Sequence, residues 1–180
     1  MMSRLTKKKL ITCIQPVRLI AFDVDGILTD GGMYYFENGD QAKKFNVRDG
    51  IAIEAFQKAG YITAILTGED TPIVTFRAKK LKIPYVYLGV KDKLMIMQVL
   101  LKKLHLLWTQ VAYVGDEVND IELLQHAGFA ISVHDAHDKV KKIADYICQT
   151  KGGDGVVREI YALFEKYRKL PLKSKGDNIG

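Results

Sequence analysis

The chain has 180 residues, of which 48% are hydrophobic and 27% are charged. These values exclude an intrinsically disordered or fibrous protein and fit one globular domain large enough to bury a full core. The formal net charge is +6, but residues 1–10 and 166–180 each carry +4, so the region between them is at −2. Because the positive charge lies at the two ends, we do not expect a nucleic-acid-binding protein.

The sequence divides into a basic N-terminal segment at 1–16, a single domain at 17–168 and a flexible basic tail at 169–180. Its two cysteines, Cys13 and Cys148, stand alone without metal-binding spacing. They predict reduced thiols rather than a disulfide scaffold or a zinc site. No stretch reaches the length of a membrane span, and no complete signal peptide is evident. We therefore expect a cytoplasmic protein without membrane contact.

Apolar runs alternate with amphipathic stretches along most of the chain, which is typical of an α/β domain with a mainly parallel sheet. A buried first strand is expected at 17–22. Asn38-Gly39 then separates two short apolar runs, and this dipeptide favours the tight turn of a β-hairpin. We expect a small hairpin insertion at about 33–45.

The elements after the hairpin continue the alternation. Asp49 is expected to cap the next helix, and Pro72 suits the first turn of a later one. Further strands are expected at 61–66, 85–88, 111–114, 129–133 and 146–148. Helices are expected at 49–59, 71–81 and 91–104, then from just after Gly115-Asp116 to about residue 126, at 137–143 and from 156 onward.

Polar residues with catalytic potential follow the expected strands at their carboxyl ends, where open α/β sheets bind ligands. Three such groups occur, and a lysine begins a later helix. They are Asp23-Val-Asp25-Gly26, Thr67-Gly68, Gly115-Asp116 with Asp120, and Lys93. Three or more carboxylates, a hydroxyl and an ammonium group would then meet at one edge of the sheet.

This combination indicates magnesium-dependent phosphoryl transfer. Crowded carboxylates repel one another, and a hard divalent cation with oxygen ligands removes that conflict. Asp23 can act as a nucleophile that forms an acyl phosphate. Asp25 can protonate the leaving oxygen and later deprotonate water. Thr67 and Lys93 can hold the phosphate oxygens while charge moves.

Each motif also has a simpler interpretation. Asp-x-Asp-Gly occurs in turns and calcium loops, Thr-Gly is common turn chemistry, and a single lysine such as Lys93 is usually a solvated helix residue. The shared placement just after apolar runs favours the functional interpretation of the set.

The four motifs, in this order from Val17 to Glu165, resemble those of the haloacid-dehalogenase superfamily of aspartate-nucleophile phosphatases. The resemblance implies a Rossmann-like three-layer core. It also implies Mg²⁺ held by Asp23, Asp116 and the backbone carbonyl of Asp25, with Asp120 orienting Lys93 or a metal-bound water.

Within the superfamily the chain resembles the capless phosphatases of 3-deoxy-2-keto sugar acids, and among them the octulosonate 8-phosphate phosphatases of lipopolysaccharide precursor synthesis. The resemblance rests on residues 22–31, 44–50, 112–116 and 152–159. It implies a homotetramer in which the hairpin contributes to assembly and a neighbouring subunit covers each active site. The substrate-binding residues that it suggests are Asn46, Val47, Arg48, Asp49, Gly50, Gly68, Glu69, Arg77 and Lys80.

Two glutamates depart from the octulosonate pattern, which usually has arginine at the positions of Glu54 and Glu69. Glu69 and Lys80 instead resemble relatives that dephosphorylate nine-carbon keto-deoxy acids. A glutamate accepts hydrogen bonds from sugar hydroxyls but repels a carboxylate, which arginine would bind in bidentate fashion. A nonulosonate 9-phosphate is therefore the alternative substrate.

We thus expect an enzyme that releases phosphate from a small anionic sugar phosphate. A phosphomutase is disfavoured because no large cap is visible. A non-catalytic assembly module remains the rival from another class, against which the retention of Asp25 and Lys93 argues.

Overall fold

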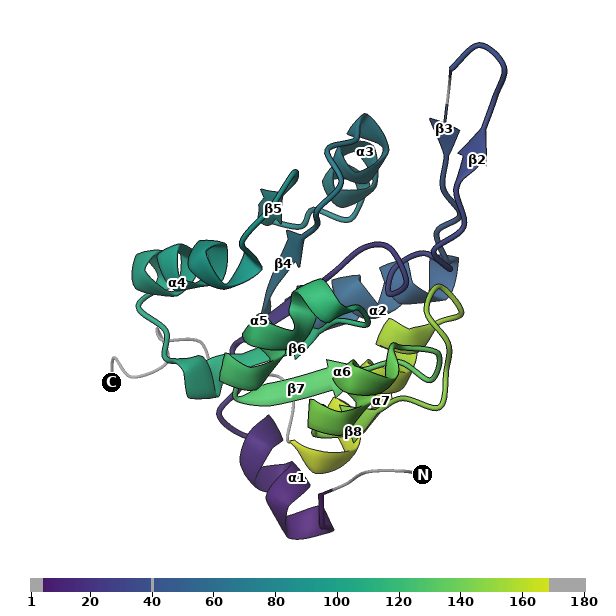
Figure 1. The fold of residues 1–180 in the computed structure, drawn as a ribbon. Helices are drawn as coiled ribbons and strands as arrows, with labels where there is room; N and C mark the ends of the chain where they lie inside the picture. The colour runs from purple at the N-terminus through teal and green to yellow at the C-terminus, as the bar shows by residue number, and fades with distance from the viewer. Residues whose placement is uncertain (1–4, 40, 169–180) are drawn as a thin grey trace.

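A computed structural model describes residues 5–39 and 41–168. Its centre is a six-stranded, fully parallel sheet in the order β5-β4-β1-β6-β7-β8 (Figure 1). The strands are β1 (Leu19–Phe22), β4 (Ile62–Leu66), β5 (Tyr85–Tyr87), β6 (Val111–Val114), β7 (Phe129–Ser132) and β8 (Tyr146–Ile147). This confirms the Rossmann-like α/β fold predicted from the sequence, and the strand order reverses at β1, where ligand sites form in such sheets.

Helices cover both faces of the sheet, because each right-handed crossover between parallel strands places its helix on a face. One face carries α2 (Val47–Lys58), α3 (Pro72–Lys80) and α7 (Val156–Tyr167). The other carries α4 (Lys93–Leu104), α5 (Ile121–His126) and α6 (Asp138–Ile143). Two 3₁₀ turns, Trp108–Gln110 and Val118–Asp120, flank β6.

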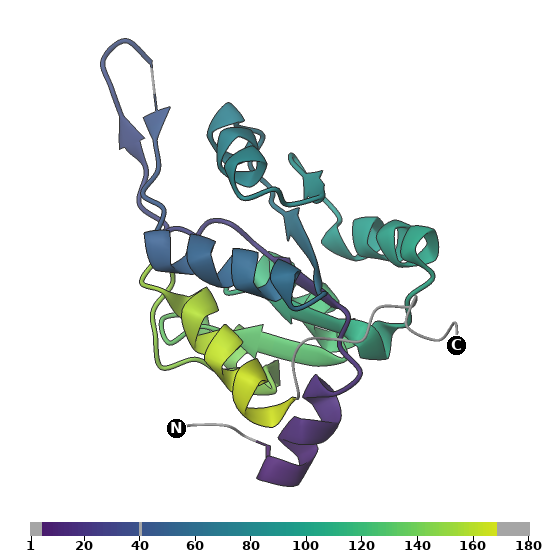
Figure 2. The same cartoon turned by 180° about the vertical axis from the view of Figure 1, so that it is seen from behind.

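The first helix was not predicted from the sequence. Residues Lys7–Ile14 form α1, capped by the Thr6 side chain, and Leu10 and Ile14 are buried in the hydrophobic core. Figure 2 shows α1 next to the end of α7, and the guanidinium of Arg168 donates to the backbone carbonyl of Ile14 over 3.1 Å. The apolar face of α1 was not recognised in the sequence because this segment begins with three lysines. Residues 1–4 and 169–180, which include the expected basic tail, lie outside the described residues.

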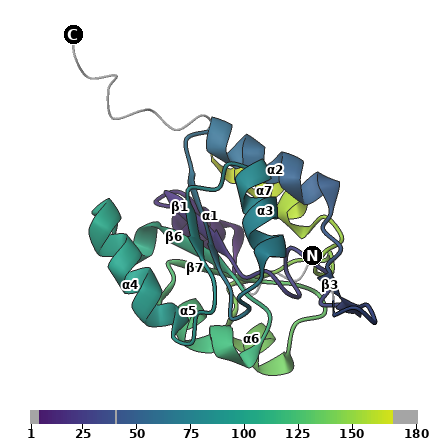
Figure 3. The same ribbon diagram turned by 90° about the horizontal axis from the view of Figure 1, so that it is seen from above.

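An aromatic cluster joins α2 to α7 on one face of the sheet. The Phe56 ring meets the Tyr61, Tyr161 and Phe164 rings edge to face, with centroids 4.9–5.3 Å apart. Such contacts add to the free energy gained by burying the rings. Figure 3, viewed from above, shows these two helices side by side, with α4, α5 and α6 on the opposite face. These ring contacts therefore pack α2 and α7 together on one face of the sheet.

The predicted hairpin forms a projecting arm, defined here as residues 33–39 and 41–45 (Figures 1 and 2). Its strands β2 (Tyr34–Tyr35) and β3 (Gln41–Ala42) pair antiparallel, and an isolated bridge between Thr29 and Phe45 closes its base. Tyr34, Tyr35 and Phe36 are 55–68% exposed. Exposed aromatic side chains gathered on one arm are typical of an interaction surface.

Among the described residues, no helix has the length and apolar character that a membrane span requires.

Candidate active site

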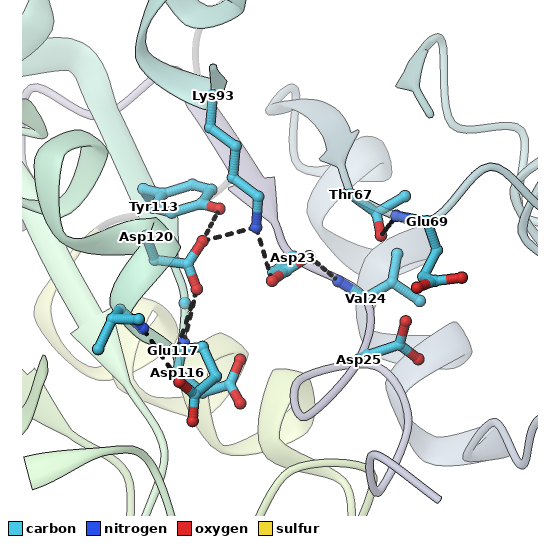
Figure 4. Close-up of polar contacts among 12 residues, drawn as sticks. Asp23, Val24, Asp25, Thr67, Glu69, Lys93, Tyr113, Asp116, Glu117 and Asp120 are labelled. Atoms are coloured by element: carbon cyan, nitrogen blue, oxygen red, sulfur yellow. Dashed lines mark hydrogen bonds and ion pairs between the residues drawn. The ribbon is translucent and has the colours of Figure 1, made fainter. Parts of the chain in front are cut away.

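Asp23 directly follows β1 and is only 6% exposed. Its backbone amide donates to the Val114 carbonyl of β6 over 3.0 Å, which extends the parallel ladder by one residue. The Val24 amide donates to Asp23 Oδ1 over 2.7 Å, and Lys93 Nζ lies 2.7 Å from Asp23 Oδ2 (Figure 4). The carboxylate is thus fixed at the carboxyl edge of the sheet, as the sequence predicts.

Lys93, at the start of α4, is held between two carboxylates. Its Nζ lies 2.7 Å from Asp120 Oδ1 as well as from Asp23. Burial lowers the pKa of Lys93, but the attraction of Asp23 and Asp120 outweighs this effect and raises it above its usual value. The two carboxylates therefore hold the ammonium group in its charged form.

Asp120 is fully buried, and both of its oxygens accept hydrogen bonds. Oδ1 accepts from Lys93 and from the Tyr113 hydroxyl, which lies 2.6 Å away. Oδ2 accepts from the backbone amides of Asp116 and Glu117 over 3.0 and 3.2 Å (Figure 4). Of the two roles inferred for Asp120, this geometry supports the orientation of Lys93. Tyr113 was missed by sequence reasoning, since a strand tyrosine is usually only a core residue.

Asp23, Asp116 and Asp120 each present an oxygen to a common point, with all three atoms within 4.8 Å of one another. Asp116 Oδ1 is buried without a hydrogen-bond partner among the described residues. Gly26 leaves room for this carboxylate, since a Cβ there would lie 2.0 Å from Asp116 Oδ2. A buried carboxylate oxygen without a donor, beside two further acids, fits a hard cation such as Mg²⁺.

The pKa values of the cluster support this assignment. Burial, together with repulsion from Asp23 and Asp120, raises the pKa of Asp116 to about 8. Burial and the charge of Asp120 raise the pKa of Asp23 to about 6, against the opposing effect of Lys93. A divalent cation would remove both penalties, and Asp23 and Asp116 are the residues placed to hold it.

Thr67 directly follows β4, the strand that pairs with β1, and is 1% exposed. Its Oγ1 accepts a hydrogen bond from the Glu69 amide over 3.3 Å, which leaves the hydroxyl proton to donate to a ligand. The backbone of this turn is fixed by bonds from Thr67 N to the Tyr87 carbonyl and from Val90 N to the Thr67 carbonyl. Gly68 and the Glu69 side chain are exposed at the mouth of the turn.

Asp25 is held by a residue that sequence reasoning missed. The Thr29 hydroxyl donates to Asp25 Oδ1 over 3.1 Å, and Lys43 Nζ lies 2.6 Å from Asp25 Oδ2. The Lys43 side chain is fully buried, whereas that of its neighbour Lys44 is 55% exposed and pairs with Asp30. Alternation along the extended arm was the available signal, because one of two successive residues faces inward.

Several predicted substrate-binding residues form contacts between segments of the chain. Asn46, and not Asp49 as expected, caps α2 by accepting from the Arg48 amide, and its side-chain amide donates to the Gly153 carbonyl. Arg77 Nη2 donates to the Asn46 carbonyl over 2.9 Å. Asp49 is 2% exposed and accepts from the Val157 amide over 2.8 Å, at the start of α7.

Gly50 permits the Arg77 contact, because a Cβ at this position would lie 2.7 Å from Arg77 Nη2. Val47, Arg48 and Lys80 are exposed. Among the described residues, no hydrogen bond or ion pair joins the predicted sugar-binding set to the carboxylate cluster. The structure brings together Asp23, Asp25, Thr67, Lys93, Asp116 and Asp120 at one edge of the sheet, and it leaves the sugar-binding set as a prediction.

The glycine-rich turn before α7 packs against the catalytic loop. A Cβ on Gly152 would lie 1.8 Å from the Gly26 carbonyl oxygen, and the Gly153 amide donates to the Ile27 carbonyl over 2.9 Å. Gly153 also has a positive φ of 69°, which favours glycine. This turn supports the loop that carries Asp25.

Comparisons with known proteins agree with this geometry. Residues 85–160 match the family of haloacid dehalogenase-like hydrolases. The chain is 37% identical over 169 residues to the 3-deoxy-D-manno-octulosonate 8-phosphate phosphatase KdsC of Salmonella typhi, which covers 94% of this chain and 90% of the relative. It is also 37% identical to KdsC of Escherichia coli K12 over 163 residues, covering 91% and 87% of the two chains.

Solved structures show the same relationship. The Moraxella catarrhalis octulosonate 8-phosphate phosphatase, in complex with magnesium, phosphate and 3-deoxy-D-manno-octulosonate (KDO), superposes with a TM-score of 0.88 at 37% identity, covering 91% and 94% of the two chains. The cobalt-bound Haemophilus influenzae phosphatase gives a TM-score of 0.82 at 34% identity, covering 88% and 91%. This chain therefore belongs to the 3-deoxy-D-manno-octulosonate 8-phosphate phosphatase family of haloacid dehalogenase-like hydrolases.

Proposed function

We propose that this protein is a magnesium-dependent phosphatase that converts KDO 8-phosphate to KDO and inorganic phosphate. The observation that carries the proposal is the buried Asp23, fixed 2.7 Å from Lys93 and next to the unpartnered Asp116 oxygen. Relatives that are 37% identical over most of the chain carry this substrate in their names.

In the first half of the reaction, Asp23 attacks phosphorus and the sugar oxygen leaves. Asp25 donates a proton to that oxygen, which avoids a free alkoxide. Lys93 and the Thr67 hydroxyl bind phosphoryl oxygens, and their charge and dipole stabilise the transition state. Asp23 and Asp116 would hold Mg²⁺, whose positive charge would lower the repulsion between nucleophile and phosphate.

In the second half, water attacks the phosphorus of phospho-Asp23. Asp25 now accepts a proton from that water, and the bond between Asp23 and phosphorus breaks. Asp120 takes no part in bond making, since its oxygens hold Lys93, Tyr113 and two backbone amides. The cycle ends with Asp25 protonated again and inorganic phosphate released.

A nonulosonate 9-phosphate is the second candidate substrate. Glu69 is exposed two residues after Thr67, at the mouth of the catalytic turn, and can accept hydrogen bonds from sugar hydroxyls. Its charge would oppose a substrate carboxylate at the same place. Glu69 and Lys80 are thus the residues on which the choice of sugar is proposed to depend.

The active form is proposed to be a homotetramer. The exposed aromatic residues Tyr34, Tyr35 and Phe36 of the projecting arm support this proposal, because a second subunit would bury them. A neighbouring subunit would then cover the site, which is consistent with the absence of a cap domain from the described residues. The cytoplasmic location stays a prediction.

The test is a side-by-side measurement of kcat/KM for KDO 8-phosphate and a nonulosonate 9-phosphate, with Mg²⁺ present. We expect a preference for the eight-carbon substrate, and Glu69→Arg should increase it. A preference for the nine-carbon substrate would overturn the assignment of the sugar, and no turnover of either would overturn the phosphatase assignment.

A further inference from the structure

Asp25 is bound at both carboxylate oxygens by residues from two segments. Thr29, in the same loop, donates to Oδ1 over 3.1 Å, and Lys43, at the base of the projecting arm, lies 2.6 Å from Oδ2. Two donors on opposite oxygens fix the rotation of the carboxylate, and the charged donor gives the stronger contact. The orientation of Asp25 therefore depends on a residue 18 positions away.

Burial restricts Lys43 to this contact. Its side chain is 0% exposed, while that of Asp25 is 29% exposed. An ammonium group without solvent is costly unless it is paired, so its position is closely tied to that of Asp25. Lys43 has no accessible surface with which to touch substrate, whereas Asp25 keeps an open face toward the site.

The arm sets where this ammonium group lies. Lys43 directly follows β3, and the bridge between Thr29 and Phe45 ties the end of the arm to the loop that carries Asp25. A displacement of the arm would move Nζ away from Oδ2. The exposed aromatic residues of the arm and the catalytic loop are consequently parts of one connected segment.

We propose that Lys43 is a positioning residue for proton transfer by Asp25, and that it couples the projecting arm to catalysis. The proposal rests on the proposed phosphatase function. When Asp23 bonds to phosphorus and the bond to the sugar oxygen breaks, the proton of Asp25 moves to that oxygen. In the second step, Asp25 takes a proton from the attacking water as the bond between Asp23 and phosphorus breaks.

Lys43 neither gains nor loses a proton in these steps. Its 2.6 Å contact holds Oδ2, so Oδ1, which is hydrogen-bonded only to the Thr29 hydroxyl among the described residues, is the oxygen proposed to exchange the proton. The Thr29 hydroxyl lies 3.5 Å from the Val24 carbonyl and can turn toward it when Oδ1 is protonated. The arrangement thus serves both halves of the reaction without rearranging the carboxylate.

The dependence on the leaving group tests the proposal. A sugar alkoxide needs protonation as it leaves, whereas 4-nitrophenolate is a stable anion that does not. We expect Lys43→Met to lower kcat/KM for KDO 8-phosphate about 10- to 100-fold, part of the effect of general acid catalysis. For 4-nitrophenyl phosphate we expect a change of less than about threefold, since kcat/KM reports the steps up to leaving-group departure.

Lys44→Met is the matched control. Lys44 is the adjacent lysine, it is exposed, and it pairs with Asp30 over 2.6 Å outside the catalytic cluster. We expect it to leave both rates unchanged. Lys43→Gln keeps a donor for Asp25, and it serves as the second variant if the buried methionine impairs folding; it should show the same selectivity with a smaller loss.

Equal losses on both substrates, for either Lys43 variant, would overturn the proposal and leave Lys43 a structural residue. In an Asp25→Asn background, Lys43→Met should add little to the loss, because the two residues act as a unit; full additivity would contradict the coupling. The comparison of rates can be made with any alkyl phosphate that the wild-type enzyme hydrolyses. Failure of the KDO 8-phosphate assignment is therefore distinguishable from failure of the role of Lys43.

Discussion

The catalytic edge of the sheet and the projecting arm contrast in how they are built. The edge holds Asp23, Asp120 and Lys93 in a buried network in which each charge has a partner at 2.7 Å. The arm has two strands of two residues each and displays Tyr35 and Phe36 to solvent. One region forms its network of charges within a single chain, while the other presents exposed aromatic side chains.

This difference suggests a division of labour. The chemistry of phosphoryl transfer requires charges fixed in a low-dielectric setting, and the sheet supplies them by fold alone. Recognition of the sugar is proposed to involve a neighbouring subunit that covers the site, since the described residues include no cap domain. Lys43 lies at the junction, because it belongs to the arm by sequence and to the catalytic cluster by contact. The predictions below separate the two regions.

Removal of Mg²⁺ should have the largest effect on activity, and it acts on the catalytic edge and not on the arm. Chelation is expected to lower kcat by about 10³-fold or more, for both alkyl and aryl phosphates, since both need Asp23 as a nucleophile. The measurement is phosphate release before and after addition of a chelator, with restoration by excess Mg²⁺ as the control. Near-normal rates in the chelated enzyme would contradict the requirement for Mg²⁺ and the role of Asp116 in binding it.

The pKa values add a pH dependence to this prediction. Asp116 and Asp23, with raised pKa values of about 8 and about 6, hold protons more tightly in the folded metal-free state than in the unfolded state. The metal-free fold therefore loses stability as pH rises from about 4 to about 8. Mg²⁺ displaces those protons, so its affinity should rise over the same window.

Thermal unfolding with and without Mg²⁺ measures this linkage. At a concentration of about 100 Kd, bound Mg²⁺ should raise Tm by roughly 5–10 °C near pH 8. The rise should be smaller near pH 6, where Asp116 is protonated. Asp116→Asn is the control and should abolish the difference between the Tm rises at the two pH values. An equal rise in Tm near pH 6 and near pH 8 in the wild type would show that Mg²⁺ binding does not displace protons from these carboxyl groups.

Disruption of the arm should have an intermediate effect. The double substitution of Tyr35 and Phe36 by serine removes exposed aromatic surface without touching the carboxylate cluster. We expect loss of the proposed tetramer in sedimentation experiments and a fall of about tenfold or more in kcat/KM for the sugar phosphate. Leu107→Ser, at another exposed apolar residue, is the control. A tetramer that persisted at wild-type rates would assign the arm another role.

Substitution of Asp49 has the smallest predicted effect, and this effect is on the stability of the fold. Burial raises the pKa of Asp49 to about 6, against the opposing effect of backbone donors that include Val157. Its ionised form therefore destabilises the fold above about pH 6, and this cost is absent below about pH 4. Asp49→Asn keeps an acceptor for the Val157 amide and removes the charge.

We expect Asp49→Asn to be about 1–2 kcal/mol more stable than the wild type near pH 8 in urea unfolding, with no gain near pH 4. Asp49→Ala should be less stable than the asparagine variant at both values, because the start of α7 loses its acceptor. If Asp49→Asn instead raised KM strongly without a change in stability, the substrate-binding role predicted from the sequence would be supported.

The sequence predicts the catalytic edge well because its geometry follows from a general rule. Parallel strands end at a common edge, so Asp23, Thr67 and Asp116 could be placed together from the apolar runs that precede them. The contacts of Lys43 and Tyr113 were missed. Alternation along the arm offered a signal for Lys43, whereas all four residues of β6 are buried and give none for Tyr113. The α1 helix was missed because only two of its eight residues are buried.

The sugar-binding set stays a prediction that rests on resemblance. Asn46, Asp49 and Arg77 were suggested by resemblance, and in the folded chain they bind backbone groups of neighbouring segments. Those contacts join residues 31 to 108 positions apart, which no local pattern predicts. Motif order therefore indicates the reaction more directly than it indicates the substrate.

The central claim is that Asp23 is the nucleophile of this phosphatase, and trapping of the phosphoenzyme tests it most directly. Wild-type protein is mixed with KDO 8-phosphate and Mg²⁺, quenched in acid within one turnover and mapped by mass spectrometry. We predict phosphate on the peptide that contains Asp23, no phosphopeptide and no phosphate release with Asp23→Asn, and normal behaviour with the exposed control Asp30→Asn. Continued turnover by Asp23→Asn, or phosphate on another residue, would contradict the claim.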